Sequence, residues 1–540
     1  MLFCYLADFS KTFSLSSEYL IDSSLGATAM TSPLLYWRTL RHLTVRQLAY
    51  QIWNRLRPRP RLRWANGLPT NVPGLAFPLT VTYLNQPVTF TNGIDWNHAE
   101  NGKLWTYCLA YFEDLPQRPA QEGLALIYDF IRQTNTLHDA LEPYPTSLRL
   151  LHWRAFLVRT NHHDPVILRH MRQQTALLRG RLEYHLGGNH LLENACALVT
   201  MGVFLENAAW LGTGNTLLRA QLAEQILTDG GHYERSPVYH QLLTARLLDL
   251  TQLLEATPPP AHPTLSAFVR AKTAAMLNWL VAVTFRNGSV PMVNDAAAGV
   301  APTTATLLGR ARALGFAPVA TRLGQSGYRM LTTPRLELFA DVGPVGPNHQ
   351  PGHAHADTFS FVLHVDGQPL VVDPGTSTYQ TGPRRQWERS TAAHNTVVVA
   401  GQNSSEVWGV FRVGRRAQVT LLTDTPTCLE ATHNGYAHLG ETHRRRWVLG
   451  QNNTLRIYDT FSNEKSIKQS YVYLCNCIDL NSERINSRVN INNILIEFDN
   501  TNPVQVRTYH RATGFNQTTP ASYLLVPFAT TLTTLISAPP

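Results

Sequence analysis

The order of helical and strand-like patterns along the chain constrains its fold more than any other feature. From about Trp105 to Leu314, apolar residues recur at helical spacing in segments separated by Gly, Pro, Asn or Asp. After Gly327, short segments rich in β-branched residues take their place. The pattern predicts a multidomain α+β protein, in which a helical region is followed by an all-β region with the boundary near residue 322.

Many helices in succession, joined by short loops, favour a helical solenoid or an α/α toroid over a compact bundle. No repeat of fixed length is visible, so we predict the toroid. The clearest predicted helices are Ala195 to Trp210, Thr216 to Leu227, Gln241 to Ala256 and Leu265 to Phe285. The clearest strands are Leu336 to Val342, Thr396 to Val399, Ala417 to Leu422, Arg446 to Leu449, Thr454 to Tyr458, Gln469 to Leu474 and Ile494 to Phe498.

The length of 540 residues is too great for one ordinary core and suggests two to four domains. A hydrophobic content of 44% excludes a disordered chain, and no apolar run is long enough to cross a bilayer. We assign a non-native or disordered extension to residues 1–29, which contain no signal peptide pattern. A basic helix and linker follow at 30–95, then the toroid at 96–322 and the β-region at 323–540, whose composition diverges after about 463.

The stretch from Tyr36 to Arg57 alternates apolar residues with arginines at helical spacing, which predicts one amphipathic basic helix ending before Pro58. Such a helix either lies on an anionic membrane surface or packs against the body of its own protein. The net charge of +9 likewise fits either a polyanionic partner or a solvated surface. No nucleic-acid motif accompanies the charge.

The richest stretch in ionisable groups runs from Pro351 to Thr396 and contains a predicted β-hairpin. Its strands, Phe359 to Val365 and Leu370 to Val372, are joined by Asp366-Gly367, a pair that tolerates positive φ. Pairing of these strands brings the residues before the first and after the second to one end of the sheet. We therefore expect His353, His355 and Asp373 to be neighbours. His355, Asp373 and His394 together supply two imidazoles and a carboxylate that suit zinc, although a polar turn with satisfied histidines explains the same pattern.

Two further clusters lie in the helical region. Gly187 to Asn194 places Asn189 and His190 at a helix start, where amides favour an anion, although Asn189 as a plain N-cap is the simpler interpretation. Glu193, one turn later, can orient the imidazole. Asp229 to His240 crowds polar and aromatic side chains into one interhelical turn, and packing explains them as well as function does. Its candidate residues are Tyr233, Arg235 and Tyr239.

A fourth cluster, Gly401 to Arg416, combines Trp408 with Arg412, Arg415 and Arg416. An aromatic face stacks on sugar rings and guanidinium groups pair with carboxylates or sulfates, so the cluster suits an acidic sugar. A solvated charged edge accounts for it equally well.

Together, in this order, the clusters resemble the heparinase II/III-like polysaccharide lyases. The resemblance extends from about Tyr36 to about Asn463 and is strongest at GGNHLLEN, DGGHYERSPVYH, HAHADTFSF, VVDPGTSTY and AAHNTVVV. It implies an N-terminal α/α toroid and a C-terminal antiparallel β-sandwich with the active cleft between them. It also implies cleavage of a uronate-containing acidic polysaccharide by β-elimination.

The resemblance assigns roles to individual residues. It implies that Asn189 and His190 engage the uronate carboxylate, that Tyr239 is a general acid or base, and that His353 is a second catalytic histidine. Tyr233 is an alternative to Tyr239, and Glu193 matches a supporting acid of some members. Substrate contacts are expected from Glu193, Tyr233, Arg235, Trp408 and Arg412, and ligands to a structural zinc or other divalent metal from His355, Asp373 and His394.

Two other functions remain open from the sequence. A glycoside hydrolase on the same fold needs two carboxyl groups, for which Glu193, Glu234 and Asp229 are candidates without forming an evident pair. A non-catalytic glycan-binding or assembly protein of a surface-polysaccharide system would use the basic face alone. The resemblance implies a periplasmic or cell-envelope location, whereas the start of the sequence is compatible with the cytoplasm.

Overall fold

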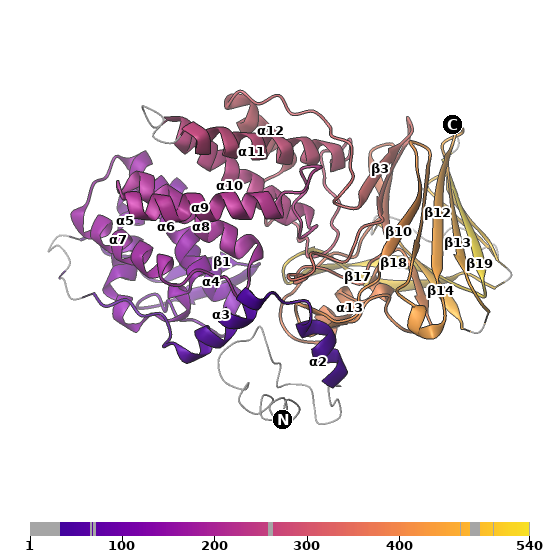
Figure 1. The fold of residues 1–540 in the computed structure, drawn as a ribbon, viewed down its shortest axis with the longest axis horizontal. Coiled ribbons are helices and arrows are strands. Elements are labelled where there is room, and N and C mark those ends of the chain that lie inside the picture. The colour runs from indigo at the N-terminus through magenta and orange to yellow at the C-terminus, as the bar shows by residue number, and fades with distance from the viewer. Residues whose placement is uncertain are drawn as a thin grey trace. The chain divides into compact units, whose positions relative to one another are not determined.

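The computed structural model describes residues 33–64, 67, 72–256, 263–464, 466–475, 487–500 and 502–538. The predicted extension at 1–29 lies outside these ranges. The chain divides into two compact units, which we name the helical unit and the sheet unit (Figure 1). The helical unit comprises Thr44–Ile226 and Leu243–Ala274. The sheet unit comprises the described residues up to Leu43, together with Leu227–Leu242 and Ala275–Pro540.

The helical unit is built from amphipathic and buried helices, with one small hairpin. Helices α8 and α9 approach closely because they meet at glycines: a Cβ at Gly202 would lie 2.6 Å from the backbone nitrogen of Leu211, and one at Gly214 would lie 2.7 Å from that of Val199. No described helix is both long and apolar enough to cross a membrane. The elements are α3 (Val45–Leu56), β1 (Leu79–Tyr83), β2 (Gln86–Phe90), α4 (Lys103–Tyr111), α5 (Ala120–Arg132), α6 (Pro143–Thr160), α7 (Pro165–Arg179), α8 (Gly188–Phe204) and α9 (Ala208–Gln225), with parts of α10 (Pro237–Ala256) and α11 (Pro263–Val283).

Several predicted helix boundaries are wrong, and local capping explains two of them. The stretch 36–57 forms two helices, α2 (Pro33–Leu40) and α3, because Thr44 and Gln47 form a reciprocal capping box that starts a new helix. The predicted helix from Ala195 to Trp210 ends earlier, since Glu206 adopts a left-handed φ of 54° and the Asn207 side chain caps the backbone N–H of Trp210.

The sheet unit contains antiparallel sheets, as the strand patterns predicted. One sheet has the order β10-β11-β12-β13-β19-β16-β15, a second β17-β18-β14-β7 and a third β3-β4-β5-β6. Their strands are β3 (Tyr328–Thr332), β4 (Leu336–Asp341), β5 (Phe361–Val365), β6 (Gln368–Val371), β7 (Val397–Val399), β10 (Val419–Asp424), β11 (Cys428–His433), β12 (His443–Gly450), β13 (Thr454–Phe461), β14 (Lys468–Tyr473), β15 (Arg488–Ile491), β16 (Ile494–Asp499), β17 (Gln505–Gly514), β18 (Gln517–Phe528) and β19 (Thr531–Ser537). The unit also holds α2, α12 (Thr304–Ala313), α13 (Pro383–Glu388) and the short pair β8 (Val407–Trp408) and β9 (Arg412–Val413).

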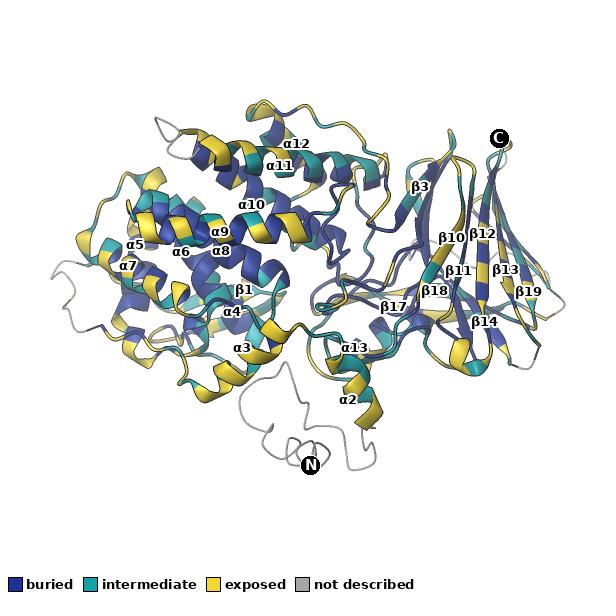
Figure 2. Ribbon diagram, in the orientation of Figure 1, coloured by how far each residue is buried: buried dark blue, intermediate teal, exposed yellow. Residues whose placement is uncertain are grey.

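One continuous apolar core joins the three larger sheets. It includes Leu338 of β4, Leu363 of β5, Trp447 of β12, Leu524 of β18 and Ile536 of β19, all fully or almost fully buried (Figure 2). Burial of alternate residues along β12 and β13 shows that these strands keep one face in the core and one in solvent.

The predicted hairpin is confirmed as β5 and β6, which pair antiparallel. Asp366 and Gly367 adopt φ values of 50° and 74° in the turn. These left-handed conformations are the reason that this pair of residues marks a hairpin in the sequence.

The loop Asp229 to His240 is hydrogen-bonded into the sheet unit although helices flank it in the sequence. Asp229 Oδ2 accepts from the backbone N–H of Gly324 and from both the N–H and the hydroxyl of Ser326, at 2.7 to 2.9 Å. Arg235 donates through Nε to the carbonyl of Ser326 at 2.9 Å. The start of α10, which carries Tyr239, is thereby held against the sheet unit.

A buried polar chain in the sheet unit predicts acid sensitivity. His433 Nδ1 accepts from the N–H of Gly435, its Nε2 donates to His443 Nδ1 at 3.0 Å, and His443 donates to Asp459 at 2.7 Å. Both imidazoles are therefore neutral in this arrangement. Burial lowers the pKa of His433 well below its usual value, and burial also lowers the pKa of His443.

Because these folded-state pKa values are lowered, the stability that the neutral histidines contribute is complete above the unfolded pKa of about 6.5 and decreases as the pH falls below it. We expect the thermal midpoint to fall between pH 7 and pH 5 in a scanning calorimetry series. His433→Phe removes one of the groups and should reduce that fall. An unchanged fall in the variant would show that this chain is not its cause.

Candidate active site

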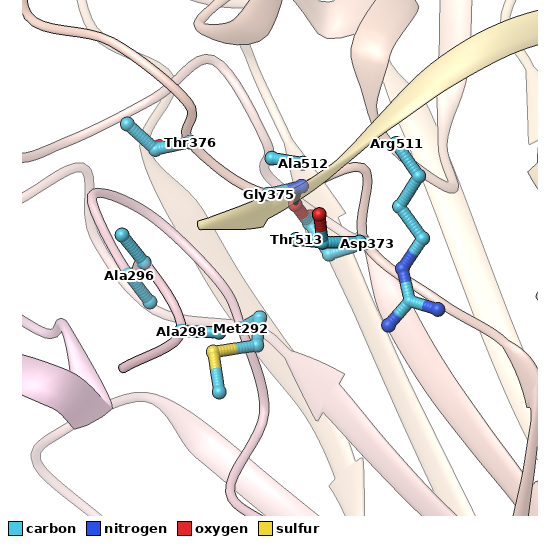
Figure 3. Close-up of a pocket in the computed structure, with 10 residues that line it drawn as sticks. Met292, Ala296, Ala298, Asp373, Gly375, Thr376, Arg511, Ala512 and Thr513 are labelled. Atoms are coloured by element: carbon cyan, nitrogen blue, oxygen red, sulfur yellow. Dashed lines mark hydrogen bonds between the residues drawn. The ribbon is translucent and has the colours of Figure 1, made fainter. Parts of the chain in front are cut away.

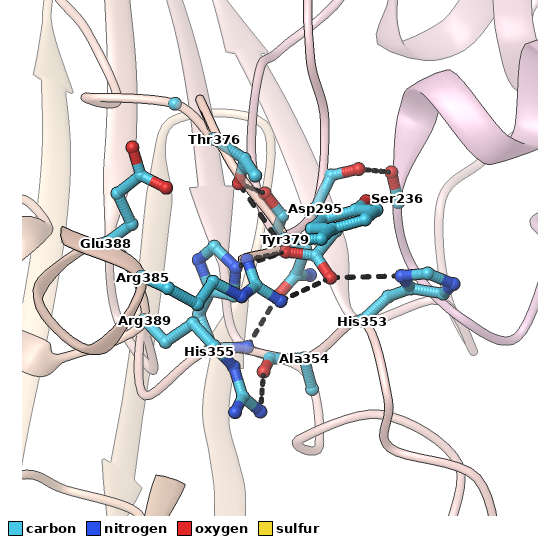
Figure 4. A network of polar contacts seen from close by, with 12 residues as sticks. Ser236, Asp295, His353, Ala354, His355, Thr376, Tyr379, Arg385, Glu388 and Arg389 are labelled. Atoms are coloured by element: carbon cyan, nitrogen blue, oxygen red, sulfur yellow. Dashed lines mark hydrogen bonds and ion pairs between the residues drawn. The ribbon is translucent and has the colours of Figure 1, made fainter. Parts of the chain in front are cut away.

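A buried carboxylate, Asp295, organises the polar centre of the sheet unit (Figure 4). The two terminal nitrogens of the Arg385 guanidinium donate one to each of its oxygens, at 2.8 Å for Oδ2. His353 donates through Nδ1 to Oδ2 at 3.0 Å, and His355 through Nε2 to Oδ1 at 2.8 Å. Burial by itself would raise the pKa of Asp295, but Arg385 and the two histidines hold it well below its usual value.

Ionised Asp295 accepts hydrogen bonds only, so its contacts fix the hydrogens of both histidines. His353 carries one on Nδ1 and His355 one on Nε2. The nitrogen of His353 that remains available for proton transfer is therefore Nε2.

Tyr239 lies on the face of the His353 ring. The two rings are stacked, with their centroids 4.0 Å apart and their planes 30° from parallel. The Tyr239 hydroxyl is 3.1 Å from the hydroxyl of Tyr379. Burial raises the pKa of Tyr239 well above its usual value, and Tyr379 adds to the increase, so the phenol is neutral at physiological pH. The structure thus brings together two of the residues predicted to be catalytic.

Backbone contacts hold these side chains in place. The N–H of Asp295 donates to the carbonyl of His353 at 3.2 Å, and the N–H of His355 donates to Asn294 Oδ1 at 3.0 Å. Asn294 Nδ2 in turn donates to the carbonyl of Arg235 at 3.1 Å. The segment around Asp295 therefore ties the histidine stretch to the loop that precedes Tyr239.

The predicted metal ligands form a second cluster beside this one. The rings of His355 and His394 have centroids 5.3 Å apart, and Asp373 Oδ2 accepts from His394 Nδ1 at 2.8 Å. Asp373 therefore contacts His394, whose ring neighbours that of His355. His355 Nδ1 and His394 Nε2 are buried and have no hydrogen-bond partner among the described residues. No three His, Cys, Asp or Glu side chains in the described part of the chain are arranged around one point as metal ligands.

A pocket of about 240 Å³ reaches this cluster at Asp373 (Figure 3). It is lined by Met292, Ala296, Thr376 and Arg511 among others. Burial lowers the pKa of His355 to about 4, which keeps its imidazole neutral. Burial acts in the same direction on His394, but Asp373 outweighs it and raises the pKa of that imidazole.

In the helical unit, His190 is held in a similar way. Its Nδ1 lies 3.1 Å from Oε1 of the buried Glu183, and its ring is 4.1 Å from that of Tyr144, centroid to centroid. Asn194 donates to the other oxygen of Glu183 at 3.0 Å. Burial would raise the pKa of Glu183, but His190 and Asn194 lower it, so an ionised carboxylate orients the imidazole. Asn189, the residue before, is buried at the start of α8.

The residues predicted to contact a substrate have structural partners. Glu193 accepts a hydrogen bond from Arg246 Nε at 2.8 Å. The carboxylate that orients His190 is that of Glu183, and not that of Glu193 as the sequence suggested. Arg235 is buried and bound to backbone carbonyls. Trp408 donates to Thr39 of α2 at 3.1 Å, and the Arg412 guanidinium lies 4.6 Å from the Trp408 ring. Tyr233 is buried against His232 and His349.

Four residues of these clusters were not predicted as site residues from the sequence: Glu183, Asp295, Tyr379 and Arg385. Tyr379 ends the VVDPGTSTY stretch, in which the sequence singles out only Asp373. Glu183 and Asp295 stand alone in segments of little pattern, and only the contacts of the folded chain single them out.

Two family models and several curated proteins are similar to this chain in sequence. The family model for the heparinase II/III N-terminus matches residues 155–309, and that for the heparinase II/III-like C-terminal region matches residues 318–537. A heparin-sulfate lyase of Bacteroides thetaiotaomicron is 26% identical over 270 residues, 42% of this chain and 38% of that protein. FtsZ-localized protein C of Caulobacter vibrioides is 29% identical over 248 residues, 42% of this chain and 40% of that protein. The matched region is thus about two fifths of each relative.

Solved structures show the same fold at low identity. A crystal structure of heparinase III superposes with a TM-score of 0.66 at 17% identity, covering 82% of this chain and 79% of that one. A heparan sulfate lyase from Pedobacter heparinus gives a TM-score of 0.56 at 15% identity, covering 83% and 79%. The predicted fold class, a helical toroid followed by an antiparallel β-sandwich, is confirmed. On the two family models and this fold, the chain belongs to the heparinase II/III-like family.

Proposed function

We propose that the protein is a polysaccharide lyase that cleaves a uronate-containing acidic polysaccharide by β-elimination. The observation that supports this most directly is the pairing of Tyr239 with His353 over the Asp295 carboxylate. It supplies a neutral phenol and an oriented imidazole within reach of one another. The heparin-sulfate lyases among the relatives favour a heparan-type polymer as the first substrate to test.

The proposed reaction needs three actions from the protein. The carboxylate of the uronate is neutralised, which makes the C5 proton acidic enough to remove. A base takes that proton, the C4–O bond breaks as a C4–C5 double bond forms, and an acid protonates the leaving glycosidic oxygen. We assign the first action to Asn189 and His190, in keeping with the orientation that Glu183 gives the imidazole.

The raised pKa of Tyr239 supports the role of proton donor for this residue. A neutral phenol can give its hydrogen to the leaving oxygen without first acquiring one. His353 is then the base, through Nε2, because Asp295 engages Nδ1 and stabilises the imidazolium that forms.

Two of the three carboxylates named for a glycoside hydrolase have other partners, whereas the third, Glu234, lies 3.8 Å from His353 Nε2. Asp229 accepts from Ser326 and Gly324, and Glu193 forms an ion pair with Arg246 at 2.8 Å. Hydrolysis requires a carboxyl pair facing the scissile bond, and these two are engaged within the protein.

A polymer panel tests the proposal. The protein is mixed with heparan sulfate, alginate, hyaluronan and bacterial exopolysaccharides, and ultraviolet absorbance follows the unsaturated ends that elimination creates. We expect a rise with at least one polymer. New reducing ends without absorbance would indicate a hydrolase, and binding without any change in polymer length would indicate a non-catalytic glycan-binding or assembly protein.

We also propose that His355, Asp373 and His394 hold a divalent metal, zinc being the first to test. Two buried imidazole nitrogens that have no hydrogen-bond partner among the described residues fit such an ion, and Asp373 lines a pocket. When bound, the ion would brace the segments that carry its ligands and so hold His353 in place. In the structure, Asp373 acts as the carboxylate that orients His394.

Metal analysis of the purified protein is expected to give about one zinc per chain. His394→Ala should lose the ion and lower the thermal midpoint, and zinc added to a chelated sample should restore that midpoint in the parent protein alone. His364→Ala, which removes a buried histidine of β5 outside the cluster, is the control and should retain the metal. Equal metal content in both variants would rule out this site.

A further inference from the structure

Helix α3 is amphipathic, but its apolar face is exposed and its polar face is covered. This is the reverse of a helix that packs on its own protein. Val45, Leu48, Ile52 and Leu56 recur at helical spacing and form one stripe, yet all are exposed, Val45 by 84% and Leu56 by 75%. Trp53 borders the stripe and is 55% exposed. Figure 2 shows α3 largely in the colour of exposed residues.

The polar face of α3 is the one that the helical unit covers. Gln47 is 4% exposed, and the Tyr50 ring lies 4.8 Å from that of Tyr184. Arg57, after the helix, donates to the carbonyl of Gly180 at 3.1 Å, and Arg181 donates to that of Pro58 at 2.8 Å. The helix is therefore attached to its unit through polar contacts. Its apolar stripe does not pack against the body of the protein, which was one of the two alternatives that the sequence pattern allowed.

Helix α2 repeats the arrangement within the sheet unit. Its Tyr36, Arg38 and Thr39 contact Trp408 and Glu406. Its apolar residues on the other side, Leu34, Trp37 and Leu40, are 49, 57 and 36% exposed. Two successive helices thus each present an apolar stripe to solvent.

The charged residues within this segment of the chain all have the same sign. Between residues 33 and 64 there are eight arginines and no Asp or Glu. At about 100° per residue, Arg46 and Arg55 fall on opposite flanks of the α3 stripe. An apolar stripe flanked by arginines matches the interface of an anionic lipid layer, where acyl chains receive the apolar side chains and headgroups pair with the guanidinium groups.

We propose that the exposed apolar stripes of α2 and α3, each on its own unit, bind anionic phospholipid membranes. The two helices lie on the bilayer interface without crossing it. The proposal is independent of the polysaccharide chemistry, and it holds whether or not the protein is a lyase.

Vesicle co-sedimentation with the full chain tests the proposal. We expect binding to vesicles that contain about one third phosphatidylglycerol, little binding to pure phosphatidylcholine, and weaker binding at about 0.5 M salt. The variant Val45→Ser/Ile52→Ser/Leu56→Ser should bind at least about tenfold more weakly, because it removes three apolar side chains without changing the charge. Arg55→Gln/Arg59→Gln should weaken binding to anionic vesicles only.

Val158→Ser is the matched control, since Val158 is 55% exposed on α6 of the same unit, away from the stripe. It should bind like the parent. Each substituted side chain is exposed, so circular dichroism and the thermal midpoint should not change in any variant.

Either of two results would overturn the proposal. One is vesicle binding that the serine variant leaves intact. The other is an absence of binding to anionic vesicles. A dimer in analytical ultracentrifugation that the serine variant converts to monomer would then show that another copy of the chain covers the stripe.

Discussion

Replacement of Tyr239 by phenylalanine is expected to abolish the rise in ultraviolet absorbance that we expect from the parent protein in the polymer panel. The substitution removes the hydroxyl of Tyr239 and leaves the ring that stacks on His353. Loss of a general acid costs about 10² to 10⁴-fold in rate, so kcat should fall by at least about a hundredfold.

Two matched variants distinguish this role from a packing effect. Tyr379→Phe removes the hydroxyl 3.1 Å from that of Tyr239 and should reduce the rate by about tenfold or less, since Tyr379 acts through its neighbour. Tyr233→Phe, in the same loop, should leave the rate nearly unchanged. A larger loss for Tyr233→Phe than for Tyr239→Phe would transfer the role to Tyr233.

Asp295→Asn is expected to produce the largest loss of stability among single polar substitutions in the sheet unit. The change leaves the fully buried Arg385 guanidinium without its counter-charge and alters the partner of both His353 and His355. Removing one partner of a buried ion pair costs about 3 to 5 kcal/mol, because the remaining charge stays out of water. Chemical denaturation followed by tryptophan fluorescence measures the change.

The chain contains a matched control for this experiment. Asp366 also forms an ion pair with an arginine, Arg335, at 2.6 Å, but that pair is exposed to solvent. Asp366→Asn should leave the denaturation midpoint unchanged, since water replaces the lost contact. Similar effects for the two variants would show that Asp295 does not organise the buried centre.

Asp295→Asn also distinguishes the contribution of Asp295 to the stability of the fold from its effect on the His353 imidazole. Below the temperature at which it unfolds, the variant retains the His353 imidazole but lacks the carboxylate that stabilises its protonated form. We therefore expect kcat on a cleaved polymer to fall while KM changes little. A change confined to KM would mean that Asp295 affects substrate binding and not proton transfer.

Much of the architecture could be predicted from local patterns. The helical and strand periods differ along the chain, and the turn pair Asp366-Gly367 specifies a hairpin by its tolerance of positive φ, so the succession of helices and sheets follows from short-range chemistry. Exact helix ends did not follow, because the caps at Thr44 and Asn207 compete with continuous apolar patterns.

The candidate site likewise contains residues that the sequence predicted and residues that only the folded structure identified. The sequence by itself singled out the candidate residues, since His353, His355, His394 and Tyr239 stand in motifs dense in ionisable groups. Only the tertiary structure decided their partners: Asp295 is 58 residues from His353 and 90 from Arg385 in the chain, and no local period relates such positions. The same is true of α3, whose sequence pattern shows an apolar stripe but not which face its unit covers. That choice depends on contacts with Tyr184 and Gly180, far along the chain, and it leaves the stripe exposed to solvent.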